Sequence, residues 1–178
     1  MILESHNVPT APIWNECKLN DASDSGYACG LWKLFHIISI GVSEQHRTVL
    51  GGKERISSAH VSDVMLNYVS IFFDCELCQV NFLQSHEKCI IDKCASLSDD
   101  VNEVSTNWKE LTTWIWYLHN DINKRKLQEE ARMSGKTVSK VEEDAVIWPG
   151  TQQCPQCRDL NGEWNRIQVF SFLFNEYW

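Results

Sequence analysis

Several signals that assign a protein to a large functional class are missing from this chain of 178 residues. It contains no apolar run of about 18 residues, so no membrane-spanning helix is predicted. No Gly-x-Gly-x-x-Gly motif follows a strand pattern, which excludes a Rossmann dinucleotide-binding domain. The stretch Met1 to His6 lacks a basic region followed by apolar residues, so no signal peptide is visible.

Basic residues are also fewer than acidic ones. Lys and Arg number 16 against 24 Asp and Glu, which gives a net charge of −8. A surface that binds nucleic acid needs a basic patch, so this balance argues against nucleic acid as a partner.

Alternation of apolar and polar residues, the pattern of a half-buried strand, is absent over any useful length. We therefore expect an all-α fold, a small helical bundle crossed by a C-terminal helix.

Apolar residues recur at three- and four-residue steps, the spacing of an amphipathic helix. Helices are expected from Gly30 onward, from Ser57 or Ser58 onward, from Trp108 to about Arg132, and from Trp164 to Tyr177. The side chains expected to be buried are Leu31, Leu34, Phe35, Ile38 and Val42 in the first helix, Val61, Val64, Met65, Tyr68 and Phe72 in the second, and Ile167, Phe170, Leu173 and Phe174 in the last.

The chain length suits one domain. We expect a flexible lead-in over residues 1–13 and a domain over residues 14–178. Asn107 and Glu110 have the spacing of a capping box at the start of the third helix. The charged stretch from Lys124 to Asp144 is expected to be a solvated face.

Eight cysteines are the most unusual feature of the composition. An even number suits an oxidising compartment, although metal binding or catalysis would explain it elsewhere. Cys17 and Cys29 could close a loop as a structural disulfide. Cys89 and Cys94 lie in a polar, acidic segment, and their pairing stays open.

Cys75 and Cys78 stand three residues apart in a stretch with helical character, so both sulfurs lie on one helical face. If Cys75 begins a helix, the exposed N–H groups there stabilise a thiolate, the reactive form of the side chain. The alternative is half of a structural zinc site, completed by Cys154 and Cys157. A zinc ribbon separates its two pairs by roughly 15 to 20 residues, and the two pairs here are much farther apart.

A polar stripe marks the third helix. Trp116, His119, Asn120 and Asn123 stand at positions i, i+3, i+4 and i+7, which places them on one face. Buried polar groups cost free energy unless they are hydrogen-bonded, so this face needs a polar partner. A ligand and a hydrogen-bonded helix contact both remain open. A dithiol that oxidises its substrates needs an electron acceptor, and the rings of a flavin would suit a pocket lined by Trp and His.

Four separated motifs together resemble the Erv/ALR sulfhydryl oxidase domain, and most closely the C-terminal oxidase module of the quiescin sulfhydryl oxidases. The resemblance covers roughly residues 14–178. The motifs are Cys29-Gly-Leu-Trp-Lys-Leu-Phe-His36, Phe72-Phe-Asp-Cys-Glu-Leu-Cys78, Trp116-Tyr-Leu-His-Asn-Asp-Ile-Asn123, and Trp148-Pro149 followed by Cys154-x-x-Cys157.

The resemblance implies a four-helix bundle with an additional C-terminal helix and FAD bound at the mouth of the bundle. It implies a flavin-dependent thiol oxidase that forms disulfides in proteins, with electrons passing from dithiols through Cys75–Cys78 to FAD and then to oxygen, which becomes hydrogen peroxide. Cys75 would meet the incoming dithiol, and Cys78 would lie against the flavin. The residues implied to line the FAD site are Trp32, His36, Asn81, Trp116, His119, Asn120, Asn123 and Trp148.

The same resemblance makes Cys17–Cys29 a structural disulfide and Cys154–Cys157 an accessory or structural pair, and it assigns no metal. Asn81 departs from the family, which usually has His there. This departure raises the alternative of a module that keeps its flavin but is inactive.

Two further departures concern the FAD phosphates. Ser25 and Ala145 stand where basic residues are expected, so Lys124, Arg125 or Lys126 would have to contact the phosphates.

The implied partners are protein dithiols or a thioredoxin-like electron donor, together with molecular oxygen. A homodimer is a further option, because the small Erv enzymes pair through their bundles. The implied location is the secretory pathway, in the endoplasmic reticulum or Golgi lumen or outside the cell, with the mitochondrial intermembrane space as the alternative. No thioredoxin pattern occurs in these residues, so such a donor would lie in a longer parent chain or in a separate protein.

Overall fold

The computed structural model describes residues 25–47, 55–73, 76–88, 96–101 and 109–178. The residues used in the predictions above that lie outside this part of the chain include Cys17, Cys75, Cys89, Cys94, Asn107 and Trp108. The chain divides into two compact units, Met1–Leu34 and Phe35–Trp178. Each unit is described separately below.

The described part of the N-terminal unit is the first half of helix α1 (Ser25–Arg47). Cys29 and Leu31 are buried there, and Cys29 takes part in a disulfide. The prediction that Leu34 is buried is wrong, because 47% of this side chain is exposed. Trp32 also belongs to this unit and is half-buried.

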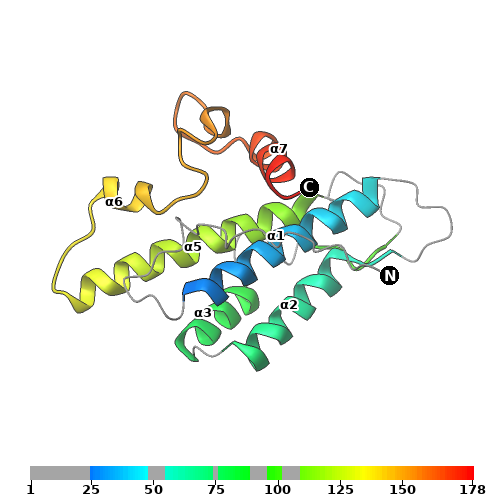
Figure 1. Ribbon diagram of the computed structural model, residues 1–178, viewed down its shortest axis with the longest axis horizontal. Coiled ribbons are helices and arrows are strands. Elements are labelled where there is room, and N and C mark those ends of the chain that lie inside the picture. Colours follow the sequence, from blue (N-terminus) through cyan, green and yellow to red (C-terminus); the bar gives the residue numbers. More distant parts are fainter. Residues whose placement is uncertain (1–24, 48–54, 74–75, 89–95, 102–108) are drawn as a thin grey trace, which may run out of the picture. The chain divides into compact units, whose positions relative to one another are not determined.

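Every regular element in the described part of the second unit is a helix, and the one extended pairing there is an isolated bridge between Arg158 and Trp164. This confirms the all-α class (Figure 1). After the second half of α1, the elements are α2 (Ser58–Phe72), α3 (Glu76–Glu87), α5 (Glu110–Met133), α6 (Lys140–Ala145), the short 3₁₀ helix η3 (Pro155–Cys157) and α7 (Arg166–Tyr177). None of the described helices is both long enough and apolar enough to cross a membrane.

Helix α2 begins where the sequence predicts. The Ser57 side chain caps it by accepting a hydrogen bond from the backbone N–H of His60, which satisfies one of the free donors of the first turn. Its buried face carries Val61, Met65 and Val69 and lies against α3 and α5. The predictions for Val64 and Phe72 are wrong, since they are 51% and 63% exposed; the packed stripe runs through Val69 instead.

Helix α5 is the longest of the described helices and begins at Glu110, with Lys109 as its N-cap. No side chain caps this end. The carboxylate of Glu110 is instead paired with Arg166, the first residue of α7. The expected capping box with Asn107 lies outside the described residues, and the Glu110 side chain is engaged elsewhere.

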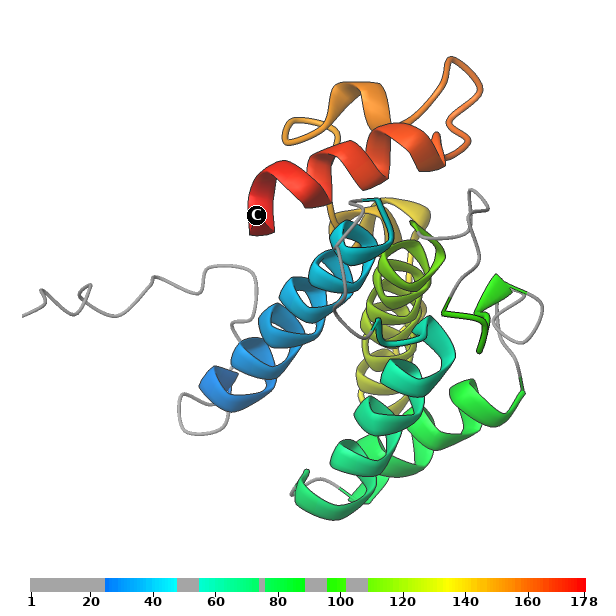
Figure 2. The ribbon, with the colours of Figure 1, turned by 90° about the vertical axis from the view of Figure 1, so that its right-hand side faces the viewer.

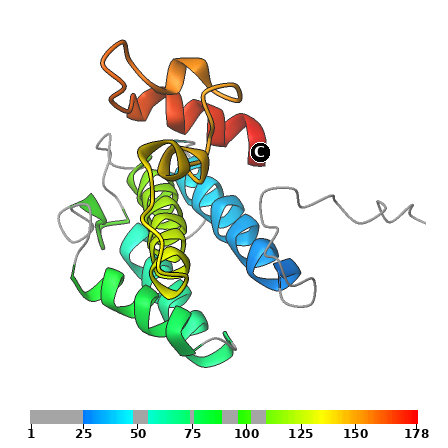
Figure 3. The same cartoon turned by 90° about the vertical axis from the view of Figure 1, so that its left-hand side faces the viewer.

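Helix α7 runs across α5 rather than along it (Figure 2, Figure 3). Its buried residues are Val169, Phe170 and Leu173. The prediction for Ile167 is wrong, because this side chain is 65% exposed and Val169 occupies the packed face. The core cluster beneath α7 contains Ile40, Trp116, Cys154, Cys157, Val169, Phe170 and Leu173.

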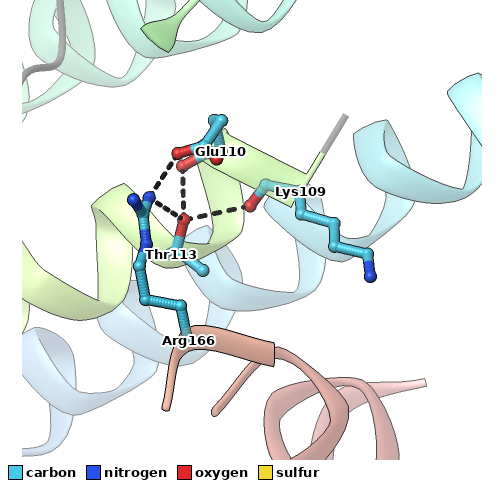
Figure 4. A network of polar contacts seen from close by, with 4 residues as sticks. All are labelled: Lys109, Glu110, Thr113 and Arg166. Atoms are coloured by element: carbon cyan, nitrogen blue, oxygen red, sulfur yellow. Dashed lines mark hydrogen bonds and ion pairs between the residues drawn. The ribbon is translucent and has the colours of Figure 1, made fainter. Parts of the chain in front are cut away.

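Polar contacts fix the first turn of α7 on the first turn of α5 (Figure 4). Arg166 donates hydrogen bonds to the Glu110 carboxylate and to the Thr113 hydroxyl. The Thr113 hydroxyl in turn lies within hydrogen-bond distance of the Lys109 and Glu110 carbonyl oxygens, at 3.2 and 3.1 Å. Because the ion pair is partly exposed, it contributes mainly to the register between the two helices.

Candidate functional site

The site is centred on His36, which α1 places in the interior with no exposed surface. Its Nε2 atom lies 3.3 Å from Nδ1 of His119 on α5. One of the two nitrogens therefore carries the hydrogen and the other accepts it, so the tautomers of the two rings are coupled.

Both histidines are held in the neutral form. Burial lowers the pKa of His36 well below its usual value, and the neighbouring His119 lowers it further. Burial also lowers the pKa of His119, to about 4. The charged form is disfavoured because the interior cannot replace its hydration.

The second nitrogen of His36, Nδ1, has no hydrogen-bond partner among the residues that the structure describes. Whichever tautomer is present, this atom is a buried donor or acceptor that remains to be satisfied. Buried polar atoms are nearly always hydrogen-bonded, so an atom of this kind marks a place where a further polar group would be stabilised.

The polar stripe of α5 binds the segment that follows α6. Trp116 Nε1 donates to the carbonyl oxygen of Trp148 at 2.6 Å, and Asn120 Nδ2 donates to the same oxygen at 2.7 Å. The backbone N–H of Trp148 donates back to Asn120 Oδ1 at 2.8 Å. Asn123 Nδ2 donates to the carbonyl oxygen of Val146 at 3.2 Å. For these three side chains, the polar partner that the sequence requires is a backbone segment.

These hydrogen bonds place the Trp148 ring beside His36, with ring centroids 5.6 Å apart. Two rings from α7 complete the surroundings. Phe172 meets Trp148 edge to face at 5.3 Å, and Tyr177 stacks flat on His36 at 5.0 Å with an interplanar angle of 2°. The result is a group of flat side chains around one unsatisfied nitrogen.

The described cysteine of the redox motif, Cys78, lies on α3, is exposed, and takes part in a disulfide. The next residue, Gln79, ties α3 to the end of α2, because its Nε2 donates to the carbonyl oxygens of Phe73 at 2.6 Å and Ser70 at 3.3 Å. Asn81 lies one turn further along α3 and is half-buried.

Of the basic residues after the stripe, Arg125 is already engaged: it donates to the hydroxyl of Ser85 on α3 and pairs with Asp121. Lys126 lies 3.9 Å from Glu130, and partial burial lowers the pKa of Lys126. Arg125 therefore joins α5 to α3, which leaves Lys124 and Lys126 as the better candidates for phosphate.

The sequence profile of the Erv1 / Alr family matches residues 29–144. The chain belongs to the Erv1/Alr family. This match confirms the resemblance that the four motifs indicate.

Curated relatives extend over nearly the whole chain. Sulfhydryl oxidase 1 of Gallus gallus is 28% identical over 169 residues, which is 93% of this chain and 19% of that protein. Sulfhydryl oxidase 1 of Oryza sativa subsp. japonica is 28% identical over 171 residues, 92% of this chain and 28% of that protein. Sulfhydryl oxidase 2 of Mus musculus is 26% identical over 92% of this chain and 21% of that protein. The chain thus spans less than a third of the length of these relatives. No solved structure matches it significantly.

The Erv1/Alr match ends at residue 144, so the rings of Trp148, Phe172 and Tyr177 lie beyond it. Trp148 was anticipated from its motif, whereas Tyr177 was not. Its position at the end of an apolar helical stripe gave no sign that its ring meets a histidine near the other end of the chain.

The structure brings together six of the eight residues predicted to line the FAD site: His36, Trp116, His119, Asn120, Asn123 and Trp148. Asn81 lies on α3, and Trp32 belongs to the N-terminal unit. Cofactor binding by all eight stays a prediction.

The zinc alternative is not supported. Cys154 and Cys157 form a disulfide with each other, so neither offers a thiolate to a metal. Among the described residues, no group of three or more His, Cys, Asp or Glu side chains could hold a metal ion. The side chains of Cys154 and Cys157 are at most 1% exposed and lie in the core beneath α7, the environment expected for a structural disulfide.

Proposed function

We propose that this Erv1/Alr chain is an FAD-dependent thiol oxidase that introduces disulfides into proteins and reduces oxygen to hydrogen peroxide. The observation that carries the proposal is the unsatisfied Nδ1 of the fully buried His36, set among the flat side chains of His119, Trp148 and Tyr177. The proposed architecture is a four-helix bundle of α1, α2, α3 and α5 with α7 as the additional C-terminal helix, and with FAD at the mouth of the bundle.

The residues around His36 fit a flavin. A large planar ligand needs flat apolar surfaces and a small number of fixed polar groups, and this cluster offers both. The residues that would hold the cofactor are Trp32, His36, Asn81, Trp116, His119, Asn120, Asn123 and Trp148. Lys124 or Lys126 would contact its phosphates.

Cys75 and Cys78 would exchange with the substrate. A substrate thiolate attacks the Cys75–Cys78 disulfide, with Cys75 as the sulfur attacked, and forms a mixed disulfide. The second substrate thiolate then releases Cys75, so the substrate gains one disulfide and this chain gains two thiols. When bound, the flavin would supply an electron acceptor for that dithiol and a route to oxygen.

The neutral histidine pair supports such a site. Because burial lowers both pKa values, His36 and His119 stay uncharged at neutral pH and can offer one hydrogen-bond donor or acceptor without placing a cation beside the ligand. Their hydrogen bond keeps the ring edges fixed relative to each other.

The proposed substrates are protein dithiols, or a thioredoxin-like protein that delivers electrons from them. The relatives are far longer than this chain, so the donor could be supplied by a longer parent chain or by a separate protein. A homodimer and a location in the secretory pathway complete the proposal, with the mitochondrial intermembrane space as the other location.

The test is a visible absorption spectrum of the purified protein, followed by oxygen consumption with dithiothreitol. We expect a bound flavin in the wild type, and turnover that is lost in Cys75→Ser and Cys78→Ser while flavin is retained. The matched control is the double variant Cys154→Ser/Cys157→Ser, which removes the other Cys-x-x-Cys pair and should keep turnover.

A protein that is free of flavin after mild purification would contradict the proposal. Flavin that is retained without oxygen consumption would instead favour the inactive flavin-binding module that Asn81 suggests.

A further inference from the structure

Tyr177 is the last residue of α7 and lies outside every motif that identifies the family. Its ring is nearly parallel to the His36 imidazole, with the centroids 5.0 Å apart. The other two rings against His36, those of His119 and Trp148, are tilted by 39° and 55°. Tyr177 is therefore the one neighbour among these three that covers a face of the imidazole.

Two contacts together define the orientation of His36. The bond from Nε2 to His119 fixes one edge of the ring, and the stacked Tyr177 ring fixes its plane. A ring whose edge and plane are both fixed has only one direction for its remaining nitrogen. That nitrogen is Nδ1, the buried atom without a partner in the described part of the chain.

Helix α7 is held in a way that keeps Tyr177 in place. Arg166 anchors its first turn to Glu110 on α5, and Leu173 is fully buried in the core that contains the Cys154–Cys157 disulfide. The Tyr177 ring also contacts Trp148, at 6.0 Å between centroids. The end of α7 therefore rests on both α1 and the segment that α5 holds.

We propose that Tyr177 is a positioning residue of the cofactor site, which holds the plane of His36 so that Nδ1 is directed at the flavin and which shields the histidine pair from water. The part of this inference that concerns the flavin rests on the proposed function. The positioning of His36 itself does not depend on any ligand.

The test uses three variants of the full chain. Tyr177→Ala removes the ring, Tyr177→Phe keeps the ring and removes the hydroxyl, and Trp178→Ala removes a neighbouring aromatic side chain that is 70% exposed. Circular dichroism and thermal unfolding show first that each variant keeps its helices. Should Tyr177→Ala fail to fold, Tyr177→Leu keeps an apolar side chain and serves in its place.

The first measurement is an NMR titration of the histidine rings in flavin-free protein. Within the described part of the chain, the pKa of His36 is lowered by its burial and, to a smaller extent, by His119 on α5. We expect the His36 ring to gain exposure in Tyr177→Ala, so that its pKa moves up toward the value of a solvated histidine. Tyr177→Phe and Trp178→Ala should titrate like the wild type.

The second measurement is the dissociation constant of FAD, by fluorescence titration of flavin-free protein. A pair of stacked rings contributes enough to change a binding constant by about two- to tenfold when one ring is lost. We expect an increase of this size in Tyr177→Ala, and a shift in the visible flavin band, with both restored in Tyr177→Phe.

Unchanged His36 titration and unchanged FAD affinity in Tyr177→Ala would overturn the inference. Equal losses in Tyr177→Ala and Trp178→Ala would also overturn it, because they would show a general weakening of α7. A wild type that binds no flavin would overturn the proposed function and the part of this inference that concerns the flavin, and the histidine titration would still decide whether Tyr177 holds His36.

Discussion

His36 and His119 are in direct contact, and His36 has no exposed surface, so protonating its ring would place a charge where water cannot reach it. The polar stripe on α5 was correctly predicted to need a partner. The sequence could not identify that partner, because the carbonyl oxygen of Trp148 reaches Trp116 and Asn120 only after the chain between them has folded back. Backbone groups leave no trace in a sequence pattern.

Acidification should destabilise the protein through this histidine pair. An unfolded histidine has a pKa of about 6.5, whereas burial lowers the pKa of His119 to about 4 in the folded state. Between these two values the unfolded chain binds the proton and the folded chain does not, so the free energy of unfolding falls as the pH falls. For His119 alone, the loss amounts to roughly 3 kcal/mol, and it is complete once the pH is below both values.

Urea denaturation of flavin-free protein between pH 4.5 and 7.5 measures this loss. We expect His119→Gln to flatten the dependence of stability on pH, since the variant lacks a group that binds a proton in the unfolded chain but not in the folded one. His60→Gln is the control, because His60 is an exposed histidine on α2. If His119→Gln followed the wild-type curve, the neutral, buried state of His119 would be refuted.

At the scale of helices, the 3.6-residue period located α1, α2, α5 and α7. The starts of α2, α5 and α7 lie within two residues of the prediction, whereas α1 begins at Ser25 rather than at Gly30. The same period was less successful in predicting which face of each helix is buried. Val64 and Ile167 are apolar and stand at helical spacing, yet each is more than half exposed. Val64 and Val69 lie on two neighbouring apolar stripes of α2. Which of the two stripes is buried depends on where the neighbouring helices pack against α2.

Helix α6 was missed, although a local signal for it exists. Ser139 and Glu142 form a complete capping box in which the Ser139 hydroxyl accepts from the Glu142 N–H and the Glu142 carboxylate accepts from the Ser139 N–H. The high charge of the surrounding stretch indicated a solvated surface, and α6 indeed buries none of its residues. Charge content and helix formation are independent properties here.

Because α6 has no buried residues, its stability depends mainly on this cap. Ser139→Ala should remove about 1 kcal/mol from the helix, with little change in the global free energy of unfolding, because α6 adds no side chain to the core. Hydrogen exchange of the amides over residues 140–145 measures the local effect. Thr137→Ala, at an exposed position before the helix, is the control. A large drop in global stability would show that α6 has a packing role that its exposure does not indicate.

At the scale of the whole molecule, the described cysteine of one Cys-x-x-Cys pair and both cysteines of the other occupy opposite environments. Cys78 is exposed on α3, whereas Cys154 and Cys157 lie within the core under α7. The sequence identified both pairs and could not distinguish their burial, since spacing alone is the same in each. The difference arises because α7 folds over one pair, and that contact depends on residues far along the chain.

Burial should therefore separate the reactivities of the two pairs. Thiol–disulfide exchange requires a thiolate to approach a sulfur atom, and the core beneath α7 leaves at most 1% of Cys154 and Cys157 accessible. In a brief pulse of dithiothreitol followed by alkylation, mass spectrometry should find label on Cys78 and none on Cys154 or Cys157. The label should reach the buried pair only when urea unfolds the protein.

Arg166→Ala, which removes the anchor of α7 on Glu110, should accelerate labelling of the buried pair and leave Cys78 unchanged, because Cys78 lies on a different helix. Equal labelling of both pairs in the native protein would show that α7 opens readily, and the distal pair would then be available as an electron shuttle rather than serving as a fixed part of the core.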